Sequence, residues 1–170
     1  MTNMRWLIAF LALAGMVAAI LALREHSRTE GESPCSINER WDCGIVNKSR
    51  FASIGGVFDQ LTNRSVVPSD DAKPRFEAIR KIPVADVGIA GYILLGLLAL
   101  MRRWRLLVAA AVLAFSFSCY LAYIEKYILE KWCIYCVISL GMITLITVLS
   151  LVALIVDWRR SRRARTESAA

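Results

Sequence analysis

Four long segments of this 170-residue sequence almost completely lack charged side chains. They are residues 6–23, 84–101, 106–124 and 132–156, and Asp86 is the one charged residue among them. None shows a polar stripe at helical spacing, which argues against a soluble helical bundle. Because about 20 apolar residues cross a bilayer as a helix, the segments predict an all-α membrane protein, a bundle of four transmembrane helices.

The sequence also has no lipidation motif and no clear signal-peptide cleavage site. The apolar run of a cleaved signal peptide usually spans about 7–15 residues. The first segment, residues 6–23, is longer than that, and no small-x-small site follows it before Arg24. We therefore expect this segment to be retained as an anchor helix.

The formal net charge of +7 does not indicate a nucleic-acid partner, because the arginines lie beside the apolar segments. Lys and Arg in short flanks stay in the cytoplasm. The three basic flanks fall on the same side of a four-span protein, which predicts that both termini are cytoplasmic. The loop 24–83 and the link 125–131 are then outside. The arginines in question are Arg5, Arg102, Arg103, Arg105, Arg159, Arg160, Arg162, Arg163 and Arg165.

The outer loop 24–83 is too short to be a separate domain with its own core. Residues 1–170 are therefore expected to form one membrane domain, with the loop as its periplasmic cap. The pattern of residues 47–61 predicts a short helix broken near Gly55 and Gly56, and Pro83 is suited to open the second span. The basic tail 157–170 is predicted to be disordered and cytoplasmic.

Histidine is almost absent, and cysteine is scarce. His26 is the single histidine and is expected to be a solvated loop residue rather than a base. Of the five cysteines, Cys119 falls within the third span, where a lone cysteine usually fills apolar space. The other four, Cys35, Cys43, Cys133 and Cys136, fall on the outer side, where disulfides persist.

Cys133 and Cys136 form a Cys-x-x-Cys motif at the start of the fourth span. The first turn of a helix has unpaired N–H groups and a partial positive charge, which favour a thiolate. Such a dithiol can pass two electrons, and its place at the membrane surface suggests a lipid-soluble substrate. A purely structural disulfide is an alternative interpretation. A four-cysteine zinc site is less favoured because the seven residues between Cys35 and Cys43 suit it poorly, so no metal is expected.

The loop pair, Cys35 and Cys43, has a plausible role beside this dithiol. A soluble protein does not easily reach thiols at the membrane surface. A mobile loop pair can carry electrons from such a protein to the dithiol by thiol–disulfide exchange.

Taken together, these motifs resemble the bacterial branch of the vitamin K epoxide reductase family. The resemblance is carried by "CSINERWDC", by Ser49, by "IPVADVGIAGYILLG" and by "WCIYC". It implies a four-helix membrane bundle around a quinone, capped by the outer loop. It also implies that Cys133 and Cys136 are the active-site pair, with Cys136 nearest the quinone. Cys35 and Cys43 match the shuttle pair, and Ser49 matches the loop residue near the quinone.

The sequence departs from this family in two respects. Animal members carry an asparagine near the start of the second helix and a tyrosine one turn after the Cys-x-x-Cys, where this chain has Val84 and Leu140. Plain quinone reduction is therefore expected rather than epoxide reduction. Many bacterial relatives carry a fused thioredoxin domain. The short tail here predicts a separate protein partner.

These expectations describe a thiol oxidoreductase of the bacterial inner membrane. It would reoxidise a DsbA-like thioredoxin-fold partner in the periplasm and reduce ubiquinone or menaquinone. A DsbB-like oxidase has the same role, but that family places its Cys-x-x-Cys in the first outer loop. A non-enzymatic four-span scaffold with structural disulfides is the alternative from another class.

Overall fold

The computed structural model describes residues 2–27, 38, 40–62 and 79–167. Its helices are α1 (Thr2–Ser27), α2 (Cys43–Lys48), α3 (Ile54–Thr62), α5 (Val84–Leu100), α6 (Trp104–Ile124) and α7 (Ile134–Glu167). A 3-10 turn, Arg50–Ala52, precedes α3, and a π-helical turn, Glu125–Leu129, prolongs α6. The described residues contain isolated β-bridges but no strand, which confirms the prediction of an all-α protein.

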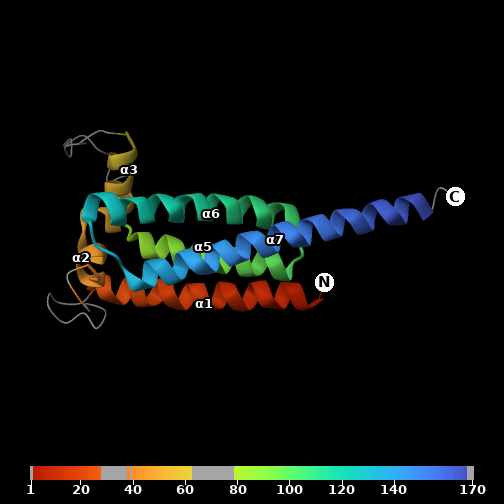
Figure 1. The fold of residues 1–170 in the computed structure, drawn as a ribbon, viewed down its shortest axis with the longest axis horizontal. Coiled ribbons are helices and arrows are strands. Elements are labelled where there is room, and N and C mark those ends of the chain that lie inside the picture. Colours follow the sequence, from red (N-terminus) through yellow and green to blue (C-terminus); the bar gives the residue numbers. More distant parts are fainter. Residues whose placement is uncertain (1, 28–37, 39, 63–78, 168–170) are drawn as a thin grey trace.

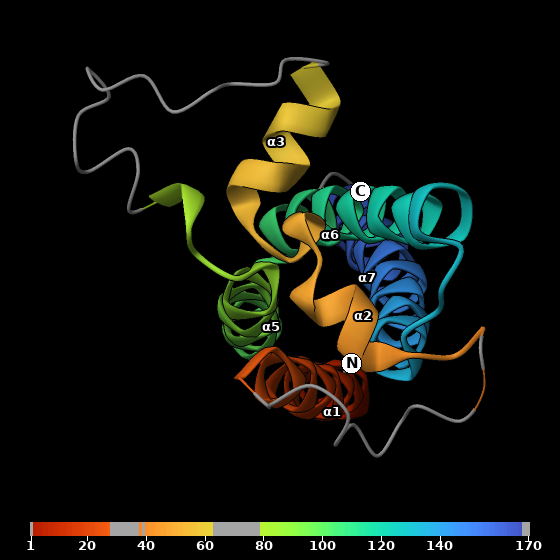
Figure 2. The same ribbon diagram turned by 90° about the vertical axis from the view of Figure 1, so that its left-hand side faces the viewer.

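Four long helices, α1, α5, α6 and α7, run side by side along a common axis (Figure 1). Helix α1 packs against α5 and α7, and α6 packs against α7. Both chain termini lie at one end of these helices, and α2 and α3 lie at the opposite end. Seen from that opposite end, α2 lies across the helix ends, whereas α3 points outward (Figure 2). We call the end that carries α2 and α3 the cap end.

Three helical segments are long and apolar enough to cross a membrane: Asn3–Ser27, Trp104–Leu129 and Ile134–Arg163. The fourth apolar helix, α5, has 17 residues, which corresponds to about 26 Å against a hydrocarbon core of about 30 Å. These helices bury small and branched side chains against one another and expose large apolar side chains on their outer faces, among them Leu7, Phe10, Leu113 and Val148. Helices that are apolar on both faces suit a lipid environment.

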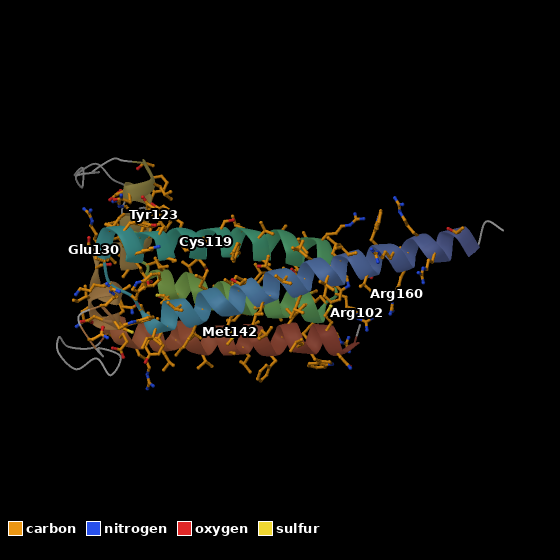
Figure 3. The ribbon with its side chains drawn as sticks, in the orientation of Figure 1. Arg102, Cys119, Tyr123, Glu130, Met142 and Arg160 are labelled. Atoms are coloured by element: carbon orange, nitrogen blue, oxygen red, sulfur yellow. The ribbon has the colours of Figure 1, made fainter. Side chains whose placement is uncertain are left out.

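Two predictions about these helices are wrong. Helix α7 continues to Glu167, so the chain after Val156 is not disordered through most of its length. Its Arg, Ala and Glu residues are good helix formers, and the Arg162 guanidinium lies 3.8 Å from the Trp158 ring centroid. Cys119 does not fill core space, because it is exposed on α6 (Figure 3).

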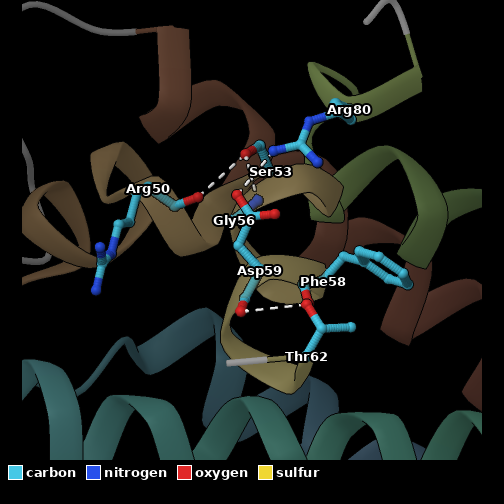
Figure 4. A network of polar contacts seen from close by, with 7 residues as sticks. All are labelled: Arg50, Ser53, Gly56, Phe58, Asp59, Thr62 and Arg80. Atoms are coloured by element: carbon cyan, nitrogen blue, oxygen red, sulfur yellow. Dashed lines mark hydrogen bonds and ion pairs between the residues drawn. The ribbon is translucent and has the colours of Figure 1, made fainter. Parts of the chain in front are cut away.

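The chain between α2 and α3 turns at Ser49 and Ser53, not at the glycine pair as predicted. Both Gly55 and Gly56 lie inside α3. Figure 4 shows the Ser53 hydroxyl donating to the Arg50 carbonyl at 3.0 Å and accepting from the Gly56 N–H at 3.4 Å. A Cβ atom on Gly56 would lie 1.9 Å from that Arg50 carbonyl oxygen. Gly56 is therefore needed for the close approach of α3 to the turn before it.

An ion pair holds α3 to the segment before α5. The Arg80 guanidinium contacts the Asp59 carboxylate at 2.7 Å, with both side chains partly buried. The Ile54 N–H also donates to the Ile82 carbonyl at 3.1 Å. These contacts fix the start of α3 beside Pro83, the residue that precedes α5.

We expect Gly56→Ala to lower the free energy of unfolding by about 1–3 kcal/mol, the usual cost of forcing an extra methyl into a packed site. Thermal unfolding in detergent, followed by circular dichroism, measures this. Gly141→Ala is the matched control, because nothing lies within 4 Å of the added Cβ there. An equal stability of the two variants would contradict the close-approach explanation.

Candidate functional site

The cap is joined to the start of α7 by backbone hydrogen bonds on both sides of Trp132. The Trp132 N–H donates to the Arg40 carbonyl at 2.9 Å, and the Asp42 N–H donates to the Trp132 carbonyl at 3.1 Å. The Trp41 and Trp132 rings pack with their centroids 6.2 Å apart. These contacts fix the register between two segments that are distant in the sequence. One segment leads directly into Cys43 and the other into Cys133.

Cys43 begins α2, and the Asp42 carboxylate caps this helix by accepting from the Ile45 N–H at 3.1 Å. Cys43 and Cys133 are both completely buried, in one apolar cluster with Val46. Cys43 is disulfide-bonded, whereas Cys133 and Cys136 are free thiols. Cys35, the predicted second member of the loop pair, lies outside the described residues. The structure therefore places Cys43, one of the two predicted loop cysteines, in contact with the predicted active-site pair.

Asn47, on α2, contacts both Cys43 and Cys133. Its side-chain amide donates to the Cys43 carbonyl at 2.9 Å and to the Cys133 sulfur at 3.4 Å. Its backbone carbonyl accepts from the Nδ1 of His26. The prediction that His26 is a solvated loop residue is therefore wrong: it lies in the last turn of α1, partly buried under the cap.

Cys133 occupies the N-cap position of α7, directly before Ile134. The Cys136 thiol and the Cys136 backbone N–H hydrogen-bond to its sulfur, and Asn47 adds a further donor. These donors lower the pKa of the Cys133 thiol, against the opposing effects of burial and of the nearby Glu125. At Cys133 the helix start therefore favours a thiolate, as the sequence predicted.

Glu125 is a residue of this site that sequence analysis missed. It is only 3% exposed, at the beginning of the π turn that ends α6. Its Oε2 accepts from the Cys133 N–H at 3.1 Å, and its carboxyl is also hydrogen-bonded to the Cys136 thiol. The sequence does contain a signal: Glu125 is the first charge after the long uncharged third segment, eight residues before Cys133.

An apolar cavity of about 540 Å³ opens among the cap ends of the four long helices, under α2 and the turn that follows it. Cys136 lines it, whereas Cys133 is not among the lining residues that the structure describes. Most of the lining is apolar, and its polar members are His26, Asn47, Ser49, Tyr92, Ser118, Glu125, Trp132, Tyr135 and Ser139. Ser49, the predicted ligand-contacting residue, lines the cavity and donates to the Val46 carbonyl at 2.8 Å.

Tyr92 fixes one wall of this cavity. Its hydroxyl lies 2.9 Å from the Ser139 carbonyl and 2.8 Å from the Ser139 hydroxyl, which links α5 to α7 one turn beyond Cys136. The Tyr92 ring packs where a side chain on Gly15 would be, since a Cβ there would lie 2.3 Å from it. Gly15 on α1 therefore leaves room for the ring of Tyr92, which joins α5 to α7.

The size and the lining of the cavity fit a quinone. Ligand cavities are typically about 300–1,000 Å³ and mostly apolar, with a few polar groups that orient the ligand. Here the Glu125 carboxyl is hydrogen-bonded to the Cys136 thiol, Ser49 is a further polar residue of the lining, and the predominantly apolar walls suit a hydrocarbon tail. The described residues contain no cluster of three or more His, Cys, Asp or Glu that is arranged to hold a metal ion.

Comparison with known families agrees with this geometry. The family model described as "Vitamin K epoxide reductase family" matches residues 6–151, which is most of the chain. The chain belongs to the vitamin K epoxide reductase family. No curated protein matches it at a significant level. Membership of the vitamin K epoxide reductase family gives the chain a membrane redox function that involves thiols and quinone-type electron carriers, as the sequence motifs indicated.

We expect Asn47→Ala to raise the pKa of Cys133, because one hydrogen bond to the thiolate is lost. In this variant the thiolate forms only at higher pH. The ultraviolet absorbance of the thiolate, titrated against pH, measures this in a background where Cys35, Cys43 and Cys119 are replaced by alanine. Ile45→Ala, on the exposed side of α2, is the control. The same titration midpoint in both variants would count against the role of Asn47.

Proposed function

We propose that this protein is a quinone-dependent thiol oxidoreductase of the bacterial inner membrane. It takes electrons from a separate DsbA-like thioredoxin-fold protein in the periplasm and passes them to a membrane quinone, ubiquinone or menaquinone. The net result is disulfide formation in secreted proteins. The whole chain, residues 1–170, acts as a single membrane domain.

One observation carries this proposal: the two thiols of the Cys-x-x-Cys have different neighbours. Cys133 is buried against Cys43 of the cap, and Cys136 lines the apolar cavity. A pair arranged in this way has one sulfur available to a protein disulfide and the other to a lipid-soluble acceptor. A structural disulfide has no need of a cavity beside it.

The proposed membrane topology has four spans, with the shorter α5 as the second. Arg102 and Arg160 lie at the end of the molecule that carries the termini, away from the cap end, where Glu130 lies (Figure 3). Short basic flanks remain in the cytoplasm. The termini are then cytoplasmic, and the cap with its cysteines is periplasmic.

The proposed electron path uses thiol–disulfide exchange. A reduced partner attacks the Cys35–Cys43 disulfide, and the freed Cys43 attacks Cys133, which releases Cys136 from the Cys133–Cys136 disulfide. The partner's second thiol displaces Cys35 from the mixed disulfide, and the partner leaves oxidised. The freed Cys35 then attacks Cys43 of the Cys43–Cys133 disulfide, which restores the Cys35–Cys43 disulfide and leaves Cys133 and Cys136 reduced. The disulfide-bonded Cys43 beside two free thiols corresponds to this last state. The reduced pair closes to a disulfide as two electrons and two protons leave for the quinone.

A quinone is a better proposed substrate than an epoxide. Val84 and Leu140 occupy the two positions at which animal relatives are expected to carry asparagine and tyrosine. Both residues line the cavity, and neither has a polar side chain. Ser49 and Glu125 are polar residues that line the same cavity as Cys136 and are available to hold the quinone ring.

The proposal predicts that purified reduced protein forms quinol when it is mixed anaerobically with ubiquinone or menaquinone. Quinol absorbance reports the reaction, and about two equivalents are expected for each protein molecule with both cysteine pairs reduced, because the loop pair re-reduces the Cys133–Cys136 disulfide. Cys119→Ser, which changes the exposed cysteine on α6, should react like the wild type, whereas Cys136→Ser should not react. Absence of quinol with every quinone tried would refute the proposed activity.

The proposed order of attack predicts that Cys136→Ser traps a disulfide between Cys43 and Cys133. Without Cys136, the link between the cap and α7 has no resolving thiol on the helix side. Peptide mapping under non-reducing conditions identifies the linked peptides. A dominant Cys35–Cys133 link would instead reverse the roles of the two loop cysteines.

A further inference from the structure

Glu125 is buried at the centre of the redox site, where none of the proposed electron-transfer steps uses it. Only 3% of the residue is exposed, and it lies at the end of a helix that is otherwise without charge from Leu106 onward. A buried carboxyl in such a setting is costly and is commonly functional. A structural reason for its presence is weak, because the cavity beside it is predominantly apolar.

The backbone around Glu125 holds the carboxyl in place. The residue opens the π-helical turn Glu125–Leu129, and its carbonyl accepts hydrogen bonds from the N–H groups of Glu130 and Lys131. Glu130 adopts a left-handed conformation, with φ of 54°, to end this turn. Single π turns are frequent at functional sites, and this one orients Glu125 toward the first turn of α7.

The side chain contacts both active-site cysteines. Its Oε2 accepts from the Cys133 N–H at 3.1 Å, and the Cys136 thiol is hydrogen-bonded both to the Glu125 carboxyl and to the Cys133 sulfur. Glu125 and Cys136 also line the same cavity. The thiol proton of Cys136 thus lies within hydrogen-bonding reach of a carboxyl that faces the site of the acceptor.

We propose that Glu125 is the catalytic acid–base of this site and exchanges its proton with Cys136, a role that rests on the proposed function. When Cys43 bonds to the Cys133 sulfur, the Cys133–Cys136 bond breaks and Cys136 leaves with the electron pair. The neutral Glu125 carboxyl gives its proton to that sulfur and becomes a carboxylate. When the pair is oxidised again, the Cys136 proton returns to Glu125 as the sulfur gives up its electrons.

This proton exchange avoids two adjacent negative charges, on Cys136 and on Glu125, in a buried site. Oxidation of the dithiol by the proposed quinone requires two protons to leave together with two electrons, and one of these protons is on Cys136. A thiolate and a carboxylate side by side in a buried site repel each other, whereas one proton shared between the two groups limits their combined charge to −1. Glu125 also borders the cavity, so it can pass that proton to the acceptor and take up another, released by the partner's thiols, before the next cycle.

The first test uses no quinone. Infrared difference spectra between the oxidised protein and the protein reduced with dithiothreitol should show the loss of a protonated-carboxyl C=O band on reduction. Glu125→Gln should lack this signal, and Glu25→Gln, which changes the other buried glutamate among the described residues, should retain it. Absence of the band in the wild type, or its persistence in Glu125→Gln, would overturn the proposal.

The second test separates a proton-transfer role from a structural one. Glutamine preserves the size of the side chain and an acceptor for the Cys133 N–H but carries no exchangeable acid proton, whereas aspartate preserves the acid and shortens the side chain. Proton exchange predicts that Glu125→Gln slows quinol formation about 100-fold or more, typical of general acid–base catalysis, and that Glu125→Asp is faster than Glu125→Gln. The opposite order would indicate that only the shape matters and would overturn the proposal.

The outcomes also distinguish this inference from the proposed function. If wild-type protein forms no quinol, the proposed function fails, whatever the infrared result. If the wild type and Glu125→Gln form quinol at equal rates, the proposed function stands and the role of Glu125 fails. Formation of the Cys43–Cys133 link in the double variant Cys136→Ser/Glu125→Gln confirms that the substituted site is still assembled.

Discussion

The structure of the site depends on the backbone pairing of Trp132 with Arg40 and Asp42. These two hydrogen bonds join a loop segment to the residues before α7, and they set the register in which α2 lies over the helix ends. Cys43 follows Asp42 directly and Cys133 follows Trp132 directly, so the pairing also sets the approach of the two cysteines. Together with the His26–Asn47 hydrogen bond, which joins α2 to α1, this pairing holds the cap over the thiol pair and the cavity.

The cap end of the molecule gathers most of the buried polar groups, and the hydrogen bonds among them account for the chemistry. Asn47 contacts Cys43 and Cys133 through its side-chain Nδ2 and His26 through its backbone carbonyl. Glu125 contacts both cysteines of the pair. Cys133 therefore has hydrogen-bond donors that stabilise its thiolate, and Cys136 has a carboxyl acceptor for its thiol proton. The cavity beside it supplies an apolar space for a lipid-soluble electron acceptor.

The helices themselves were largely predictable. Their long uncharged segments give a signal that needs no tertiary information, and the all-α class followed from them. The wrong predictions concern residues whose environment is set by a neighbouring element of the structure. Gly56 looked like a helix breaker, but it is a point of close approach to the Arg50 carbonyl. His26 looked solvated, but α2 folds over it and accepts its hydrogen bond.

The sequence by itself predicted the two cysteine pairs as the redox residues and determined that the long segments require an apolar environment. The spacing of the cysteines and the length of the uncharged segments are local properties of the sequence. They can be recognised without knowing how the helices pack. Only the tertiary structure decided that Cys43 lies on Cys133, that Cys136 rather than Cys133 lines the cavity, and that Glu125 joins the pair. These facts depend on the register between the cap and α7 and on the π turn of α6. Both are set by contacts between residues far apart in the chain, which no local pattern contains.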